Sequence, residues 1–257
     1  MPSYNRVFSE YYDRLTDDVD RPGMAEFCIA MMRRYHEKCE LVLDLACGTG
    51  TLCAEFARRG IETIGVDASA DMLSEALAKN AALEVPVLYL CQPLERLDLY
   101  GTVDLAVCTL DSLNHLKGKK ALAKALHRLQ YFVEPGGLFI FDMNTPYKHR
   151  EILGNNTFVR EAKGVYCAWQ SEYTIQENRV ELRMDLFTEQ ADGSYTRAQE
   201  HFCEYAYERE EICAMLSAEH FTLLAVYDGY AKRAPAGDTE RWVFVAQREE
   251  KKDEEQT

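Results

Sequence analysis

The chain has 257 residues, of which 47% are hydrophobic and 11% are aromatic. This length is enough for one large domain with a buried core, and the hydrophobic content excludes a disordered chain. Against 43 acidic residues stand 29 basic ones, so the formal net charge is −14. We therefore do not expect a nucleic acid as partner, because a surface that binds nucleic acid is normally basic.

The nine cysteines are scattered along the chain, with no C-x-x-C pair and no zinc-type spacing with the six histidines. We expect reduced thiols in a core and no metal site. The N-terminal residues lack the apolar run of a signal peptide, and no stretch approaches the roughly 18 apolar residues of a membrane span. The sequence thus predicts a cytoplasmic protein without membrane contact.

The first predicted element is a helix over Gly23–His36, which starts after Pro22. From residue 41 to residue 143, short apolar runs then alternate with helical patterns. Runs that are apolar almost throughout indicate strands buried on both faces of a parallel sheet. These predicted strands are Leu41–Ala46, Thr63–Asp67, Val87–Cys91, Val103–Thr109 and Leu138–Met143.

Helices are predicted between these strands, at Thr51–Arg59, Asp71–Asn80 and Lys119–Val133. In the third helix, Leu122, Leu126, Leu129 and Val133 recur at three- and four-residue spacing and form one apolar stripe. Strands that alternate with helices at this pitch indicate βαβ units with right-handed crossovers.

After Asn144 the hydrophobic period changes from that of buried strands to strict alternation. Alternation of apolar and charged residues is typical of an antiparallel sheet with one wet face. The predicted strands are Thr157–Lys163, Tyr166–Ile175, Arg179–Glu189 and Tyr195–Tyr207. A helix at Glu208–Ala218 and strands at Phe221–Tyr227 and Arg241–Gln247 follow.

The predicted fold class is therefore a doubly wound α/β protein with an inserted antiparallel β-sheet. Residues 1–148 and 208–247 would form the core, and residues 149–207 the insert, which would act as a lid over the substrate. Residues 248–257 are charged and would form a flexible tail.

A glycine-rich turn follows the first predicted strand, in the sequence Asp44-Leu-Ala-Cys-Gly-Thr-Gly50. Glycines allow backbone to approach a ligand closely, and the helix behind the turn offers free N–H groups. Asp67 ends the second predicted strand, where a carboxylate can accept hydrogen bonds from both hydroxyls of a ribose. Together the turn and Asp67 predict a cofactor that contains a nucleoside.

The same residues favour one cofactor over another. A dinucleotide fingerprint needs a third glycine, and none follows Gly50 in register. Asp44 would repel a pyrophosphate but would suit an amine. We therefore expect S-adenosylmethionine, which has an amino-acid end and a positive sulfonium, rather than NAD.

At these positions the chain resembles the class I S-adenosylmethionine-dependent methyltransferases. The motifs that carry the resemblance are Asp44–Gly50, Gly65–Leu73, Asp104–Val107 and Pro135–Gly137, and they cover about residues 4 to 143. Asp111–His115 and Phe141–Asn144 resemble a small bacterial subgroup with an antiparallel insert after the fifth strand. The resemblance implies a seven-stranded, mostly parallel sheet.

The resemblance also implies the cofactor contacts. Asp67 would hold the ribose, Ala68 and Met72 would lie against adenine, and Asp44 would order the glycine turn. Tyr11 or Tyr12, placed before the first helix, would cover the sulfonium. The full implied set is Tyr11, Asp44, Ala46, Cys47, Gly48, Gly50, Asp67, Ala68, Met72, Gln92, Leu110 and Asp111.

Three positions depart from the family pattern. Pro93 follows Gln92 where the family usually places an acid for the adenine amino group, so this contact is missing or comes from elsewhere. Arg21 and Met24 stand where the subgroup tends to have aromatic residues. Arg21 either pairs with the cofactor carboxylate or is a surface residue at the start of a helix.

The predicted catalytic residues are His115, Asn144 and Tyr12. His115 either acts as a general base, because its ordinary pKa suits neutral pH, or packs against the loop that follows the fourth strand. Asn144 either orients the acceptor or ends the fifth strand. His201, Tyr205 and Tyr207 alternate on the last insert strand and face either the pocket or the sheet surface.

The sequence therefore predicts an enzyme that transfers a methyl group to a nitrogen or oxygen of a small molecule. Two alternatives remain open. One is modification of RNA or protein, which would need a basic patch from Lys117, Lys119, Lys120 and Lys124. The other is a non-catalytic protein that binds S-adenosylmethionine, as the departure at Pro93 suggests.

Overall fold

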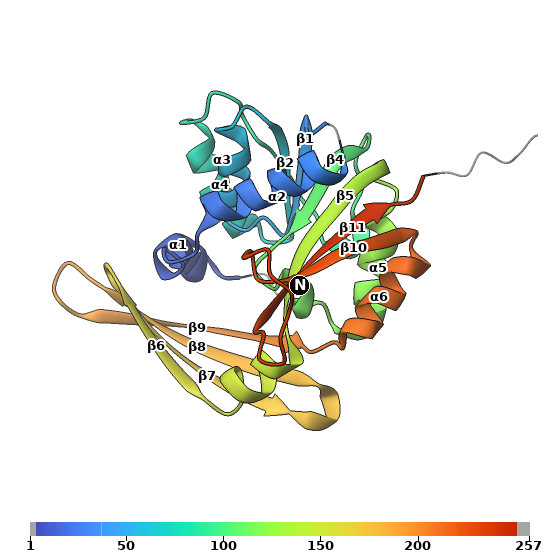
Figure 1. Ribbon diagram of the computed structural model, residues 1–257. Helices are drawn as coiled ribbons and strands as arrows, with labels where there is room; N and C mark the ends of the chain where they lie inside the picture. Colours follow the sequence, from blue (N-terminus) through green and yellow to red (C-terminus); the bar gives the residue numbers. More distant parts are fainter. Residues whose placement is uncertain (1–3, 37, 251–257) are drawn as a thin grey trace, which may run out of the picture.

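The computed structural model describes residues 4–36 and 38–250. A seven-stranded sheet with the strand order β10-β11-β5-β4-β1-β2-β3 forms its centre (Figure 1). Strands β1 to β5 run parallel, and β11 runs antiparallel to both of its neighbours. The strands are β1 (Leu41–Leu45), β2 (Glu62–Asp67), β3 (Leu88–Cys91), β4 (Val103–Cys108), β5 (Val133–Asn144), β10 (Phe221–Asp228) and β11 (Arg241–Arg248). The predicted doubly wound, mostly parallel sheet is confirmed.

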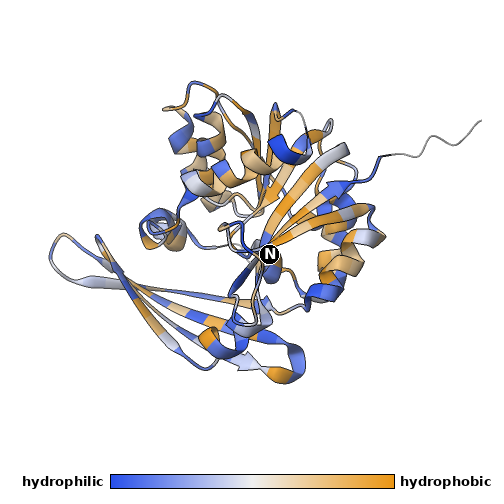
Figure 2. Cartoon of the chain, in the orientation of Figure 1, coloured by the Kyte–Doolittle hydropathy of each residue, from blue (hydrophilic) through white to orange (hydrophobic). Residues whose placement is uncertain are grey.

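Helices cover both faces of this sheet (Figure 1). One face carries α2 (Arg21–Tyr35), α3 (Thr51–Ala57) and α4 (Ala70–Asn80), and the other carries α5 (Gly118–Leu129) and α6 (Arg209–Ala218). The strands are orange in Figure 2 because apolar residues dominate them, as burial on both faces requires. None of the helices in the part of the chain that the structure describes is long and apolar enough to cross a membrane.

The insert forms a separate antiparallel sheet in which each strand pairs with the next along the chain. Its strands are β6 (Thr157–Ala162), β7 (Val165–Thr174), β8 (Arg179–Glu189) and β9 (Tyr195–Tyr205). The bounds of β8 match the prediction, since Val180, Leu182 and Leu186 are buried between charged neighbours. The predicted antiparallel β insert is therefore confirmed.

A helix that the sequence analysis did not predict, α1 (Arg6–Leu15), lies between α4 and the insert sheet (Figure 1). Asn5 caps it, because its side chain accepts a hydrogen bond of 3.0 Å from the backbone nitrogen of Phe8. Phe8 and Leu15 pack against Val165 and Leu186 of the insert. Tyr11 and Tyr12 thus lie within the first helix and not before it, which corrects the prediction.

Two predicted boundaries are also wrong. Helix α5 ends at Leu129, because the carbonyl of Phe132 accepts a hydrogen bond from Val103 and Val133 already pairs with Val103 in the sheet. At the C-terminus, Arg248 belongs to β11 and not to a free tail. Its guanidinium donates to the carbonyls of Gln130 and His220. The rest of the predicted tail from residue 251 onward lies outside the described residues.

Between β5 and β6 the chain forms a π-helix at Lys148–Leu153, which sequence periodicity did not reveal. It places His149 beneath the insert sheet, where its side chain is completely buried. The transition from sheet to insert therefore supplies a buried imidazole close to the carboxyl end of β5.

Candidate functional site

The glycine-rich turn joins β1 to α3 and is tied to the end of β2. Ala46, Gly48 and Gly50 have φ values of 55°, 54° and 69°, which glycine adopts more readily than other residues. The backbone nitrogen of Gly48 donates to Asp67 Oδ2 at 2.9 Å, and that of Ser69 donates to Asp67 Oδ1 at 2.8 Å. Each carboxylate oxygen keeps capacity for a further hydrogen bond, as a pair of ribose hydroxyls requires.

A cavity of about 40 Å³ lies between the glycine turn, the start of α2 and the end of β4. Of the residues predicted from the sequence, Tyr12, Asp44, Ala46, Cys47, Gly48 and Leu110 line it. Arg21 and Met24 also line it, and Arg21 is only 7% exposed. Arg21 is therefore not a surface residue. Its guanidinium donates to the carbonyl and the hydroxyl of Thr16, and Arg21 lines the same cavity as Asp44.

Asp44 is buried at the bottom of this cavity. The thiol of Cys53 donates to its carboxylate at 3.1 Å. Burial raises the pKa of Asp44 to about 7, because few groups nearby stabilise its charge. A cationic group in the cavity would find an acceptor there.

Asp13 connects helix α1 to the glycine-rich turn through side-chain contacts. This carboxylate accepts hydrogen bonds from the hydroxyls of Thr49 and Thr51 at 2.5 Å and 3.1 Å, and it pairs with Lys79 of α4. Tyr12 is thereby held at the cavity. Tyr11 points instead towards the insert, where it packs with Val165.

The residues predicted to surround adenine lie beyond the end of β2. Met72 is 1% exposed and packs against Phe8, while Ala68 is half-buried. The side chain of Gln92 exchanges two hydrogen bonds with the backbone of Asp98, at 2.9 Å and 3.1 Å. Gln92 is therefore directed to this loop.

Leu110 and Asp111, which follow β4, are both left-handed, with φ values of 54° and 53°. Such a conformation strains residues other than glycine, so the surroundings must hold it. Asp142 of β5 does so by accepting hydrogen bonds from both backbone nitrogens, at 2.9 Å and 2.7 Å. Arg241 pairs with the carboxylates of both Asp111 and Asp142, and Tyr230 donates to Asp142 at 2.6 Å.

Beside Asp111 lies a cluster of polar side chains that we call the buried group: Asp111, His115, Asn144, His149 and Glu204. His115 Nε2 is 3.7 Å from Asp111 Oδ2. Glu204 of β9 accepts from Asn144 at 2.8 Å and lies 2.9 Å from His149 Nε2. Two predicted catalytic residues, His115 and Asn144, thus come together.

Burial alone would lower the pKa of His115, but the carboxylates of Asp111 and Glu204 raise it above its usual value. Burial opposes ionisation of Asp111 too, yet Arg241 and His115 hold its pKa well below the usual range. The buried group therefore contains charged carboxylates and an imidazole that attracts a proton.

Five residues of these networks were given no role by sequence reasoning: Asp142, His149, Glu204, Tyr230 and Arg241. Asp142 lies within Phe141–Asn144, a motif that supports the resemblance, and this was the available signal. Glu204 lies in a strand of alternating polarity, where it looks like one more charged residue of the wet face. It is instead 4% exposed, because it lies two residues after the buried Phe202 and therefore on the same, inner face of β9.

The remaining candidates lie apart from the buried group. His201 is exposed and pairs with Glu181, while the hydroxyl of the buried Tyr207 donates to the carbonyl of Leu116. Tyr205 is half-buried, and its carbonyl accepts from Asn114. Lys119, one of the four lysines of the alternative RNA site, pairs with Glu211.

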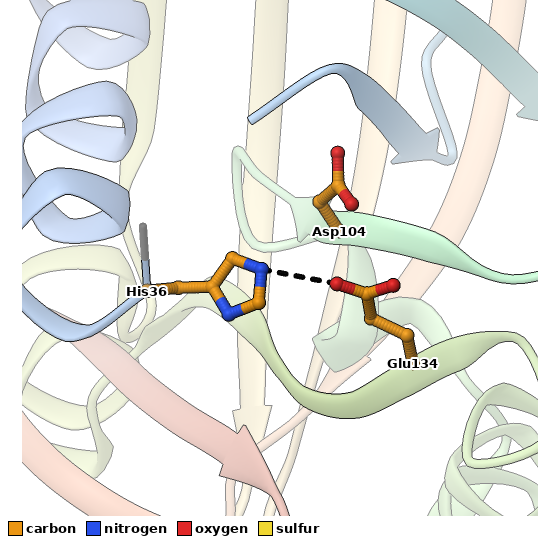
Figure 3. A group of neighbouring side chains, drawn as sticks. All are labelled: His36, Asp104 and Glu134. Carbon is orange, nitrogen blue, oxygen red and sulfur yellow. Dashed lines mark ion pairs between the residues drawn. The ribbon is translucent and has the colours of Figure 1, made fainter. Parts of the chain in front are cut away.

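A second group of titratable residues lies at the other end of the parallel strands, where β4 and β5 begin (Figure 3). It consists of His36, Asp104 and Glu134. His36 Nε2 is 3.0 Å from Glu134 Oε1, and Asp104 accepts from the backbone nitrogens of Glu40 and Leu41 at 2.6 Å and 2.8 Å. These contacts tie the end of α2 to the sheet. The geometry is that of a structural anchor away from the glycine turn.

Known proteins match both the core and the whole chain. A family model described as "Methyltransferase domain" matches residues 42–137. The structure of an S-adenosylmethionine-dependent methyltransferase from Clostridium acetobutylicum ATCC 824 is 30% identical, with a TM-score of 0.86, and the match covers 95% of this chain and 98% of the other. A Bacillus subtilis (strain 168) protein named "Putative methyltransferase YqeM" is 31% identical over 80% of this chain and 83% of its own length.

The sugar N-methyltransferase KedS8 from Streptoalloteichus sp ATCC 53650 shares the fold at 20% identity, with a TM-score of 0.77, over 97% of this chain and 95% of the other. The fold and the site define a methyltransferase. The chain belongs to the S-adenosylmethionine-dependent methyltransferases, and S-adenosylmethionine is its cofactor.

Proposed function

We propose that this enzyme methylates a nitrogen or oxygen atom of a small molecule held between the carboxyl ends of the parallel strands and the insert sheet. The observation that carries the proposal is the position of Leu110 and Asp111. Leu110 lines the cavity at the glycine turn, and Asp111, the next residue, belongs to the buried group. A donor at the turn and an acceptor at the buried group would therefore be neighbours.

The residues at the turn fit S-adenosylmethionine. A Cβ added to Gly48 would meet nothing within 4 Å, so the turn leaves open space on that side. Asp67 would accept the ribose hydroxyls, while Arg21 and Asp44 would face the carboxylate and the ammonium of the methionine end. The complementary charges on one cavity match a zwitterion.

Bound S-adenosylmethionine supplies a methyl group that is already activated by its sulfonium. The chain therefore has to align an acceptor with this methyl group and keep water away. Tyr12 and α1 would cover the turn, held by the contacts of Asp13 with Thr49 and Thr51. His115 would accept the proton of an acceptor that arrives protonated.

Three observations support a small acceptor. The buried group is enclosed, since His115 and Glu204 are 7% and 4% exposed. The ring of Phe202 lies 5.0 Å from that of His115 and covers it from the insert side. KedS8, which shares the fold, is named for a sugar amine acceptor, a small molecule.

The test is to incubate the enzyme with S-adenosylmethionine carrying a labelled methyl group and three acceptor pools: small amines and alcohols, total RNA, and denatured protein. We expect label and S-adenosylhomocysteine only with small molecules. Label in RNA or protein alone would contradict the proposal. Cofactor binding without turnover in any pool would favour a non-catalytic protein instead.

A further inference from the structure

We propose that Asp111, His115 and Glu204 form a subsite for a cation, which takes the acceptor as an ammonium group and so selects amines over alcohols. The inference rests on the proposed function and adds the chemical class of the acceptor. The ligand atoms of these three residues lie within 4.8 Å of one another and come from the loop after β4 and from β9. A group that touches all of them would bridge the core and the insert.

Negative side chains outnumber the guanidinium groups around the subsite. Three carboxylates, those of Asp111, Asp142 and Glu204, lie in this region, against the single guanidinium of Arg241. Arg241 pairs with the two aspartates, so Glu204 is left with imidazole and amide partners only. Lys148 raises the local positive potential near Asp111 but is not ion-paired with it in the described part of the chain. A buried anion needs a counter-charge: protonated His115 supplies it in the free enzyme, and a cationic ligand would take its place.

Three buried polar atoms of the buried group have no hydrogen-bond partner within the described residues. They are His115 Nδ1, His149 Nδ1 and Asn144 Oδ1. Asn144 donates its amide hydrogen to Glu204, so its oxygen is an acceptor. If His149 donates its Nε2 hydrogen to Glu204, its Nδ1 is an acceptor as well. Leaving such atoms unpaired is costly, so they indicate a ligand with several donors. An ammonium group offers up to three, whereas a hydroxyl offers one.

Aromatic rings line one side of the subsite. Phe202 lies between His115 and Tyr4, with ring centres 5.0 Å and 5.6 Å away. Aromatic rings beside anionic groups favour cations that carry carbon substituents. The backbone carbonyl of Tyr4 accepts a hydrogen bond from the hydroxyl of Ser69, two residues after Asp67, so these rings lie towards the proposed ribose site.

The proton balance is complete. The ammonium group loses one proton to His115, and the freed lone pair forms the bond from nitrogen to the methyl carbon. The bond from this carbon to sulfur breaks, and sulfur keeps the electron pair. The product leaves as a methylated ammonium ion. Without a ligand the carboxylates favour a protonated His115, but a bound ammonium supplies the charge and leaves the imidazole neutral, ready to accept the proton.

The experiment uses the full-length enzyme saturated with S-adenosylhomocysteine and pairs of probes that differ only in the polar group: phenethylamine with 2-phenylethanol, and glucosamine with glucose. Thermal shift and calorimetry report binding. We expect the amines, and not their hydroxyl partners, to bind to the wild type. We expect Glu204→Gln to weaken amine binding about tenfold or more, as for the loss of a charge-assisted contact.

Glu181→Gln is the matched control, because Glu181 lies in the same sheet and pairs with the exposed His201. Since Glu204 also supports Asn144 and His149, Glu204→Asp is made in parallel: it keeps the charge and should retain the preference for amines even if the glutamine variant does not fold. Equal binding of amines and alcohols, or no amine binding, would overturn the inference.

Two further outcomes are distinct. If Mg²⁺, Mn²⁺ or Zn²⁺ binds to wild type but not to Glu204→Gln, and EDTA abolishes probe binding, the subsite holds a metal and the inference is wrong. If amines bind as expected but no acceptor is ever methylated, the cation subsite stands and the proposed function fails.

Discussion

The carboxylate of Asp142 holds the backbone of Asp111, whose nitrogen lies 2.7 Å from Asp142 Oδ1. Asp111 belongs to the buried group and follows Leu110, which lines the cavity at the glycine turn, so this contact helps to hold the cavity and the buried group together. The partners lie 31 positions apart in the chain and meet because β4 and β5 are neighbours.

Asp142→Asn is expected to reduce the free energy of unfolding by about 3 kcal/mol, because it removes one of the two carboxylates that pair with the buried Arg241 and leaves one backbone N–H without an acceptor. Urea unfolding measures the change. Asp185→Asn, which breaks an exposed pair with Arg197, is the control and should cost less than about 1 kcal/mol. Equal losses for the two variants would show that the strained loop does not depend on Asp142.

Asp67→Ala should weaken binding of S-adenosylmethionine about 10- to 100-fold, since hydrogen bonds from two ribose hydroxyls to a carboxylate are lost. Calorimetry gives the dissociation constants. Asp71→Ala removes an exposed carboxylate from the first turn of α4, four residues away, and should leave the affinity unchanged. An unaltered affinity for the folded Asp67→Ala variant would remove Asp67 from the site.

The two glycines of the turn should respond differently to alanine. A Cβ at Gly48 or at Gly118 would meet no atom within 4 Å, so neither alanine would clash. Both residues have a positive φ, of 54° and 76°, so each alanine variant should lose about 1 kcal/mol of stability through backbone strain. Only Gly48→Ala should also lose cofactor affinity, because its methyl group enters the space that the cofactor needs. A Cβ at Gly50 would lie 2.2 Å from the hydroxyl oxygen of Tyr89, so Gly50→Ala should destabilise the fold more than either. Calorimetry and urea unfolding of the three variants separate these effects.

Asp44 should make the stability of the free enzyme depend on pH. Burial raises its pKa to about 7 from an ordinary 3.8, so folding favours the protonated form. Its contribution is therefore complete below about pH 4 and is lost as the pH rises towards 7. Between pH 5 and pH 8 the wild type should lose about 2 to 3 kcal/mol relative to Asp44→Asn. Urea unfolding of both proteins at the two pH values tests this, and parallel pH profiles would contradict it.

Local pattern was enough for much of the fold and for the identity of the cofactor. Continuous apolar runs predicted the parallel strands, because a strand buried on both faces is apolar almost throughout. The alternation around Val180 and Leu182 predicted the insert strands, because a strand buried on one face is apolar at every second residue. The positions of the turn from Asp44 to Gly50 and of Asp67 could be predicted for the same reason, because each lies within a few residues of a strand end.

Helix α1 escaped prediction because half of its apolar face is completed by the insert, more than 140 positions further along the chain. The contacts of the proposed acceptor site also escaped prediction, because they join distant parts of the chain. Arg241 reaches Asp111 across 130 positions, and Glu204 reaches His149 across 55. A charged residue carries no sign in the sequence of whether it will be solvated or buried against a distant partner. Asp44, Asp67 and Asp111 could be chosen from the sequence, but only the tertiary structure, by placing β11 against β5 and the insert over their ends, brought Asp142 and Glu204 to the same region.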